Sequence, residues 1–384
     1  MDRFRVVVVG GGVAAVEGLL RLRRLAGDAV DISLLAPNEE FAVRALSVKE
    51  PFAMGRAERH QLGKIADDQG AELVRDSLSW VDTDEQVVHT EASGELPYDA
   101  VLLAVGGRVS PAFEHVKTFR DADADALFSG VVQDIEGGYS KRIAFLAPDG
   151  PMWLLPLYEL ALMTAERVSN AGFDDVELTL VTPEPWPLAG FGRAASDAVA
   201  KLLKSAGVTV YSSALAQVPA KQHLLVQPQG VELNPDRMIA MPRISGPAIR
   251  GLPEGGPHGF IPIDRYCRVP RTQGRVFAAG DATAFPIKHG GLGAQQADTA
   301  AAAIAGLAGV DVKVEPYRAV IRGMLLTGSK PLYLTARVVG GQGFESEVSE
   351  EPLWSPPEKV SAEELGPYLA TLETPAVAAP TSDS

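Results

Sequence analysis

The sequence predicts an α/β protein with parallel sheets, and three features of the chain lead to this prediction. Residues 6–9 (VVVV) form a β-branched run typical of a strand buried on both faces, which leads into a glycine turn and a helix. A strand at 98–105 ends in Gly106, and a strand near 274–279 ends in Gly280-Asp281. Strands that alternate with helices in this way pair in parallel.

The turn after the first strand has the composition of a dinucleotide-binding loop. Gly10 and Gly12 permit a tight turn and let the backbone approach a pyrophosphate, while Ala15 is small where the helix must pack closely on the strand. Backbone N–H groups at the start of the helix, from Val13 and Ala14 onward, would face the phosphates together with the helix dipole. Taken alone, the motif also fits a strand–helix turn without a ligand.

The three glycine motifs together indicate one large dinucleotide, and we expect this cofactor to be FAD. The turn after the strand at 98–105 contributes Ala104, Val105 and Gly106. A carboxylate for the adenosine ribose is expected after the second strand, at 30–35, where the sequence offers Glu39. That contact could also fall to the backbone or be absent. Arg44 could reach the pyrophosphate or be an ordinary surface arginine.

Composition limits the function classes. The chain has 384 residues, a net charge of −14 and a pI near 5.0, which argues against nucleic acid and anionic lipid as partners. Its one cysteine, Cys267, excludes a disulfide framework, a zinc cluster and a CxxC pair within the chain, and the histidines show no metal-ligand spacing. No apolar run reaches the ~18 residues of a membrane span. We therefore expect no metal and a cytoplasmic location.

The order of motifs predicts two Rossmann-like dinucleotide-binding domains and a small C-terminal α/β cap. The FAD-binding domain is discontinuous, at 1–118 and 263–311, and the second domain spans 119–262. The cap spans 312–372, and a disordered tail follows at 373–384. The cap carries a short apolar patch at 320–326, which favours contact with its own core or with a second copy in a homodimer.

The sequence also predicts a helix after each glycine turn and a second strand–helix–strand unit. It gives a linker helix near 121–135, which starts in the DADADA stretch, and an alanine-rich helix at 294–308. The second unit follows, with strands at 142–147, 176–181 and 208–211 and helices at 157–169 and 194–206.

These motifs, over roughly residues 4–310, resemble the pyridine nucleotide–disulfide oxidoreductases, which are FAD-dependent. GGGVAA, AVGGR and AAGDAT carry the likeness, which is greatest to the branch of sulfide:quinone oxidoreductases and type II NADH dehydrogenases. The resemblance implies that Asp281 binds the ribitol chain of FAD. The alternative is that Asp281 only caps the N-terminus of a helix. It also implies that Lys288, with Gly290 and Gly291, lies near the pyrimidine end of the flavin, where a cation would stabilise negative charge. Lys288 as a plain surface lysine is the alternative.

Two departures from the family pattern bear on the reaction. After the strand at 142–147 the sequence reads PDGPMWLLP, so Trp153, two leucines and Pro156 stand where a glycine turn would bind NAD, and the strand at 176–181 ends in Thr182-Pro183 without an acid. The sulfide:quinone branch shares this loss. Two-cysteine sulfide chemistry cannot operate with Cys267 alone, which we expect to be dispensable.

The function expected from these observations is an FAD-dependent oxidoreductase that passes electrons from a small donor to a small acceptor, with a quinone as one candidate. Glu159 would then be an acid/base group near the flavin or a helix-surface carboxylate. Two alternatives stay open: an NAD(P)H-dependent reductase that binds the nicotinamide in an atypical way, and a flavin-binding scaffold or redox sensor without turnover.

Overall fold

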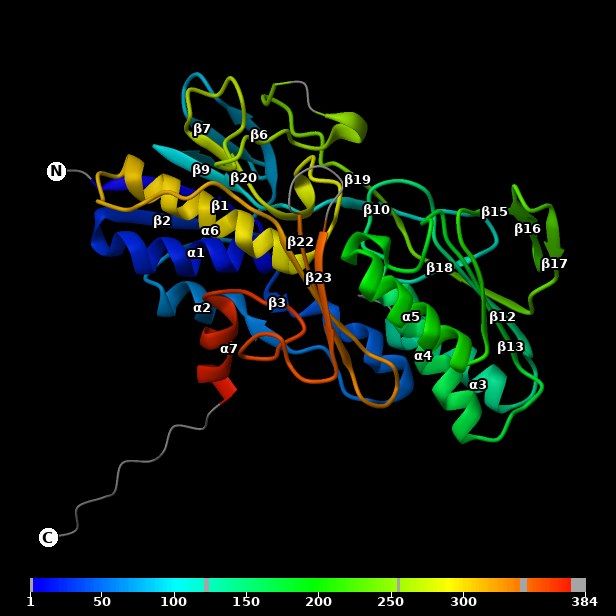
Figure 1. Ribbon diagram of the computed structural model, residues 1–384. Coiled ribbons are helices and arrows are strands. Elements are labelled where there is room, and N and C mark those ends of the chain that lie inside the picture. Colours follow the sequence, from blue (N-terminus) through cyan, green and yellow to red (C-terminus); the bar gives the residue numbers. More distant parts are fainter. Residues whose placement is uncertain (1–2, 121–123, 254–255, 339–343, 374–384) are drawn as a thin grey trace, which may run out of the picture.

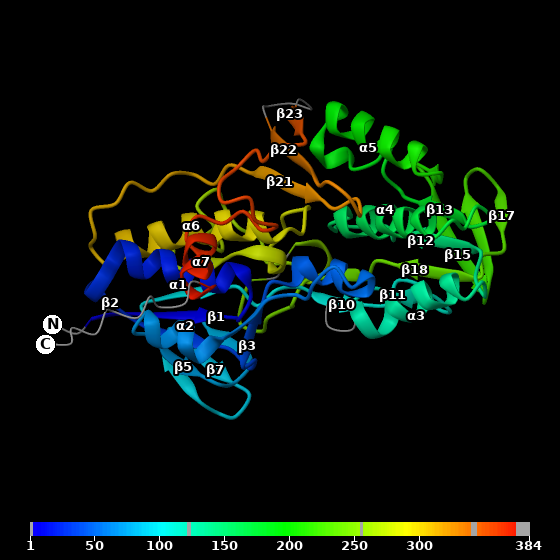
Figure 2. The ribbon, with the colours of Figure 1, turned by 90° about the horizontal axis from the view of Figure 1, so that it is seen from below.

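The computed structural model describes residues 3–120, 124–253, 256–338 and 344–373 (Figure 1). Two five-stranded parallel sheets form its centre, one in each lobe of the molecule (Figures 1 and 2). In spatial order, the first sheet contains β20 (Val276–Ala278), β9 (Ala100–Leu103), β1 (Phe4–Val9), β2 (Val30–Leu35) and β5 (Glu72–Val74). The second contains β11 (Lys117–Thr118), β18 (Arg237–Ala240), β12 (Arg142–Leu146), β13 (Glu177–Val181) and β14 (Val208–Tyr211).

Helices follow the strands as the sequence predicts. They are α1 (Val13–Ala26), α2 (Leu62–Asp68), α3 (Ala124–Glu136), α4 (Leu155–Asn170), α5 (Arg193–Ser205), α6 (Gly290–Leu307) and α7 (Leu365–Glu373). Short 3₁₀ turns are η1 (Gly27–Ala29), η2 (Arg44–Phe52), η3 (Ala189–Phe191), η4 (Pro257–Gly259) and η5 (Gly280–Ala282). The start of the predicted linker helix, at 121–123, and the predicted tail beyond 373 lie outside the described residues.

Smaller antiparallel sheets complete the molecule. The cap sheet joins β21 (Val320–Leu325), β22 (Leu332–Val338) and β23 (Phe344–Ser349). Two further three-stranded sheets are β6 (Leu78–Asp82), β7 (Val87–Thr90), β8 (Glu95–Pro97), and β15 (Leu215–Ala220), β16 (His223–Gln227), β17 (Val231–Leu233). The strand pairs are β3 (Glu40–Ala42) with β4 (Arg59–Gln61), and β10 (Arg108–Ser110) with β19 (Arg243–Ser245).

The cap sheet lies over α6 and also reaches the second lobe, where β23 packs against α5 and β21 against α4 (Figure 2). Close packing of α1 on the first sheet depends on small residues: Ala15 is fully buried, and a Cβ on Gly18 would lie 2.5 Å from the Leu102 side chain. No helix in the described part of the chain is long and apolar enough to cross a membrane.

Candidate functional site

The three glycine motifs meet at one edge of the first sheet, because β20, β9 and β1 are neighbours and all run in the same direction. Gly10 has a φ of +129°, and a Cβ there would lie 2.2 Å from the carbonyl oxygen of Ala104. A Cβ on Gly280 would lie 3.2 Å from the Cβ of Ala14. Ligands of open α/β sheets bind beyond the carboxyl ends of the strands, which is this edge.

Gly12 differs from Gly10 because the space in front of it is open. A Cβ on Gly12 would meet nothing within 4 Å. Gly12 is also the N-cap of α1, where no side chain caps the helix and no acidic residue stands in the first turn. The N–H groups and the positive dipole end of α1 are therefore directed to a space that an anion can fill. These residues fit the pyrophosphate of FAD, and Val13, Ala14 and Ala15 form the first turn of that helix.

Gly280 and Asp281 are held in place from two directions. The side chain of Gln296 on α6 accepts a hydrogen bond from the backbone N–H of Gly280 at 2.7 Å, and the Thr283 hydroxyl donates to the Gly280 carbonyl at 2.9 Å. A Cβ on Gly107 would lie 2.7 Å from Ile244 and 3.5 Å from the carbonyl oxygen of Asp281. The turn after β9, which includes Val105 and Gly106, thus lies against the turn after β20.

We expect Asp281→Ala to weaken FAD binding about tenfold to a hundredfold, since a hydrogen bond to a charged group contributes roughly 1.5–3 kcal/mol. Cys267→Ala is the matched control. Cys267 is fully buried in the core beside α6, and burial raises the pKa of its thiol, so it offers no reactive thiolate. The dissociation constant of FAD, titrated into apoprotein, measures both. Equal affinities for the two variants would contradict the assignment of Asp281.

Lys288 is buried, so its reading as a plain surface lysine is wrong. Only 4% of the residue is exposed. Its ammonium group donates to the carbonyl of Thr283 at 2.5 Å and lies 3.6 Å from the centre of the Phe260 ring. Burial lowers the pKa of Lys288 to about 8, against the opposing effect of Asp281. A buried ammonium group next to the Gly280-Asp281 turn can stabilise negative charge on a ligand that binds at this turn.

Replacing Lys288 by glutamine is expected to lower the midpoint potential of bound FAD by roughly 20–60 mV near pH 6.5, the equivalent of about 1–3 kcal/mol for a two-electron couple. Since the pKa of Lys288 is lowered to about 8, the lysine loses its charge as the pH rises through that value. The difference in potential between wild type and variant should therefore shrink above pH 9. Spectroelectrochemical titration at both pH values measures it, and a constant difference would argue against the charge of Lys288 as the cause.

The other residues that are predicted to contact FAD differ in their position and exposure. Gly290 and Gly291 form the first turn of α6, because this helix begins four residues before the predicted start at 294. Glu39 is on the surface, with 75% of its side chain exposed and a hydrogen bond from Arg75 at 2.6 Å. Arg44 is exposed at the start of η2. Their contacts with FAD stay predictions.

Glu159 is fully buried, which overturns its reading as a helix-surface carboxylate. Its Oε1 atom accepts a hydrogen bond from the Leu326 N–H at 2.8 Å and forms an ion pair with Lys359, while Oε2 has no hydrogen-bond partner among the described residues. Burial raises the pKa of Glu159 and lowers that of Lys359, and each charge opposes the shift of the other. Its role as an acid/base group stays a prediction.

The turn in the second lobe, where NAD would be expected, is filled by the protein. Leu155 and Pro156 already belong to α4, and the half-buried Trp153 packs 4.3 Å from the His289 ring, measured between ring centroids. An isolated bridge pairs Met152 with Ile287, the residue before Lys288. The β12–α4 turn thus closes onto the loop that carries Lys288.

The structure also shows an acid after β13 that the sequence reading missed. Glu184 stands where a ribose carboxylate would, yet its carboxylate points into the protein. It accepts hydrogen bonds from the Tyr158 hydroxyl at 2.7 Å and the Ala189 N–H at 3.0 Å. Burial raises the pKa of Glu184. The hydroxyl of Tyr158, a residue of α4, therefore binds the carboxylate that would otherwise be available to a ribose.

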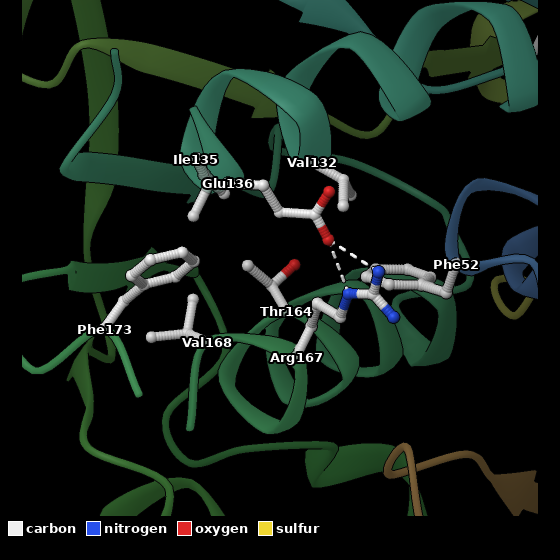
Figure 3. Close-up of a pocket in the computed structure, with 8 residues that line it drawn as sticks. All are labelled: Phe52, Val132, Ile135, Glu136, Thr164, Arg167, Val168 and Phe173. Carbon is white, nitrogen blue, oxygen red and sulfur yellow. Dashed lines mark hydrogen bonds and ion pairs between the residues drawn. The ribbon is translucent and has the colours of Figure 1, made fainter. Parts of the chain in front are cut away.

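A separate small pocket lies between α3, α4 and η2 (Figure 3). Its volume is about 10 Å³, room for roughly one water molecule. An ion pair between Arg167 and Glu136, at 2.6 Å, borders it. This pocket is too small for a cofactor. No cluster of three or more potential metal ligands occurs among the residues that the structure describes.

No protein-family model and no curated protein matches this sequence. Solved structures do match it. The sulfide:quinone oxidoreductase from Aquifex aeolicus superposes with a TM-score of 0.79 and 17% identity, over 90% of this chain and 87% of that one. The chain has the fold of this oxidoreductase. The fold predicted from the resemblance, with two Rossmann-like sheets and a cap, is thereby confirmed.

Two other structures share the fold at lower similarity. The ferredoxin reductase of the CYP199A2 system from Rhodopseudomonas palustris has a TM-score of 0.66 and 18% identity, over 88% of this chain and 83% of that one. A NAD-dependent persulfide reductase from A. fulgidus has a TM-score of 0.60 and 19% identity, over 88% of this chain and 64% of that one. At such identities the likeness establishes the fold, and the reaction has to be argued from the residues.

Proposed function

We propose that the protein is an FAD-dependent oxidoreductase that passes electrons from a small donor to a quinone or another small acceptor. The observation that carries this proposal is the meeting of three glycine turns at one sheet edge, with Gly12 facing open space at the start of α1. A flavin bound there would supply the capacity to accept a hydride or electron pair and to pass it on.

The residues of this chain would bind and tune that group. The N-terminal end of α1 holds the phosphates, and Asp281 holds the ribitol chain. Lys288 supplies positive charge from a buried position. Trp153 and His289 form an aromatic contact beside Lys288 that would exclude water from that side. These assignments rest on the positions of the residues and on the resemblance of the motifs.

The comparison with sulfide:quinone oxidoreductase favours a quinone as acceptor, but the cysteine content argues against sulfide as donor. Cys267 is the single cysteine of the chain, and it is buried. We therefore propose a donor whose oxidation needs no thiol pair. The domain boundaries given above, a cytoplasmic location and a homodimer belong to the same proposal. The apolar patch at 320–326 gives no support to a dimer through the cap, because Ile321 and Leu325 are buried in the protein's own core.

Spectra of the purified protein test the proposal. The protein should show the two-banded absorption of bound FAD, and a quinone should reoxidise the chemically reduced protein within seconds. Flavin that is bound but never reoxidised by quinones would favour the scaffold or sensor alternative. Rapid reduction by NADH or NADPH would favour the reductase alternative. A protein free of flavin, which takes up none when FAD is added, would overturn the proposal.

A further inference from the structure

The C-terminal segment 359–365 passes over the start of α6, one of the two helices that form the proposed FAD site, and is bound to α1 through Glu17. A Cβ on Gly290 would lie 3.5 Å from Val360 and 3.7 Å from Val13, and a Cβ on Gly291 would lie 3.1 Å from the carbonyl of Ser361. Val360 is 7% exposed and belongs to the same core as α1 and α6. The segment therefore lies against the first turn of α6, which is itself close to Val13 of α1.

One end of this segment is fixed by Lys359. The Lys359 ammonium group forms the buried ion pair with Glu159 of α4 and donates to the carbonyl of Met324 at 2.6 Å. A buried pair of this kind contributes little net stability but is costly to break, because one partner is then left as an uncompensated charge. Lys359 thus fixes where the segment begins.

The other end is fixed by Glu17, a fully buried carboxylate on α1. Its Oε1 atom accepts hydrogen bonds from the N–H groups of Glu363 and Glu364, both at 2.8 Å, and Oε2 accepts from the Leu365 N–H at 2.6 Å. Leu365 is the first residue of α7 and the other two directly precede it, so Glu17 caps this helix from another helix. Arg21, one turn further along α1, bonds the Glu363 and Glu364 carboxylates at 2.7 Å each.

Asp298 of α6 is the other carboxyl group beside Glu17. Burial and the neighbouring charges of Glu17 and Glu363 raise the pKa of Asp298 to about 9, against the opposing effect of Arg21. Glu17 already accepts three backbone N–H groups, so Asp298 is the member of the pair that holds a proton at neutral pH. Asp298 contacts Glu17 but takes no hydrogen bond from the segment.

We propose that residues 359–365 are a strap that retains FAD in its site, and that Glu17 is the residue that fastens it. This inference rests on the proposed function, since it concerns the same site. α1 then has two tasks: its first turn faces the phosphates, and Glu17, one turn later, holds the segment that lies against the first turn of α6. Release of the strap would uncover the N-terminal end of α6, where Gly290 and Gly291 are predicted to lie near the flavin.

The test compares two isosteric variants, Glu17→Gln and Asp298→Asn, in the full-length protein loaded with FAD. Each replaces one carboxyl group of the pair with an amide, but only Glu17→Gln weakens the three strap hydrogen bonds. The rate of FAD release, followed by capture in an excess of an FAD-binding apoprotein, should rise at least about tenfold in Glu17→Gln and change less than about threefold in Asp298→Asn. Hydrogen exchange of the wild type should also slow at residues 360–365 when FAD is added to apoprotein, because the coupling is reciprocal.

A merely structural role for Glu17 gives a different result. Glu17→Gln would then lower the melting temperature of the apoprotein while FAD release and the exchange of residues 360–365 stay unchanged, and this outcome overturns the strap. Equal release rates in the two variants overturn it as well. If the wild type takes up no FAD, the proposed function and the strap both fail; FAD bound normally but released at equal rates removes the strap alone.

Discussion

A Gly12→Val protein is expected to fold normally and to lose FAD. In the structure a Cβ at this position meets no protein atom within 4 Å, and the backbone of Gly12 is extended, with φ −99° and ψ −173°. Valine adopts extended backbone readily, so the substitution causes no strain in the protein itself. Its methyl groups would occupy the space of the pyrophosphate. Loss of two or more phosphate hydrogen bonds, each roughly 1.5–3 kcal/mol, lowers the affinity for FAD more than about a hundredfold.

Gly130→Val is the matched control for this experiment. Gly130 lies in α3, and a Cβ there also meets nothing within 4 Å. FAD content of the purified variants and the melting temperature of the apoproteins are the two measurements. Gly10 is unsuitable as a control, because its φ of +129° and the contact with Ala104 would disturb the fold. A Gly12→Val protein with full FAD content would show that the pyrophosphate does not lie in front of α1.

The topology was predictable because its determinants are local in the sequence. A run of four valines, a glycine turn and an amphipathic helix specify one strand–helix unit, and three such turns end on adjacent strands. The sequence predicts the start of α6 at 294, four residues too late, and the reason is again local. Gly290, Gly291 and Gly293 are poor helix formers, but Gly293 lies so close to Gly280 that a Cβ would be 3.0 Å from its Cα, and this packing favours glycine in the helix.

Contacts between distant segments were not predictable from one sequence. Glu17 lies in the first half of α1, and it binds backbone N–H groups almost 350 residues away in the sequence. Glu159 and Lys359 likewise form an ion pair although they are 200 residues apart in the sequence. The one available signal for Glu17 was its place between Val16 and Leu19, on the buried face of α1. A carboxylate on an apolar helix face indicates a buried partner but does not name it.

The second lobe keeps a dinucleotide-binding fold, but the residues at its β12–α4 turn differ from those that bind a phosphate. Its sheet has the same strand order and parallel pairing expected of a dinucleotide-binding unit. The β12–α4 turn, however, carries bulky side chains, and the Glu184 carboxylate accepts a hydrogen bond from the Tyr158 hydroxyl. The sequence reading identified the first change and missed the second, since Glu184 follows β13 by three residues and only the structure shows which way it turns.

We therefore expect NADH and NADPH to reduce the bound flavin slowly, with saturation only far above the micromolar range of good substrates. A nicotinamide dinucleotide needs N–H groups on an open glycine turn, and Pro156 removes one such donor from the start of α4. Leu154 and Leu155 are buried there, and Met152 is paired with Ile287, so the turn cannot open without breaking the contact with the Lys288 loop.

Each phosphate contact that is missing removes on the order of 1.5–3 kcal/mol of binding, and loss of the Glu184–ribose hydrogen bond adds a similar amount. Anaerobic stopped-flow reduction with each nucleotide measures the effect, with dithionite as the control that the flavin is reducible. Tyr158→Phe offers a second check: it removes one hydrogen bond to the Glu184 carboxylate, which keeps the bond from the Ala189 N–H, and it leaves the blocked turn, so it should not restore rapid reduction. Fast bleaching that saturates at low micromolar NADH or NADPH would show that the second lobe still binds a nucleotide, by a route that avoids the β12–α4 turn.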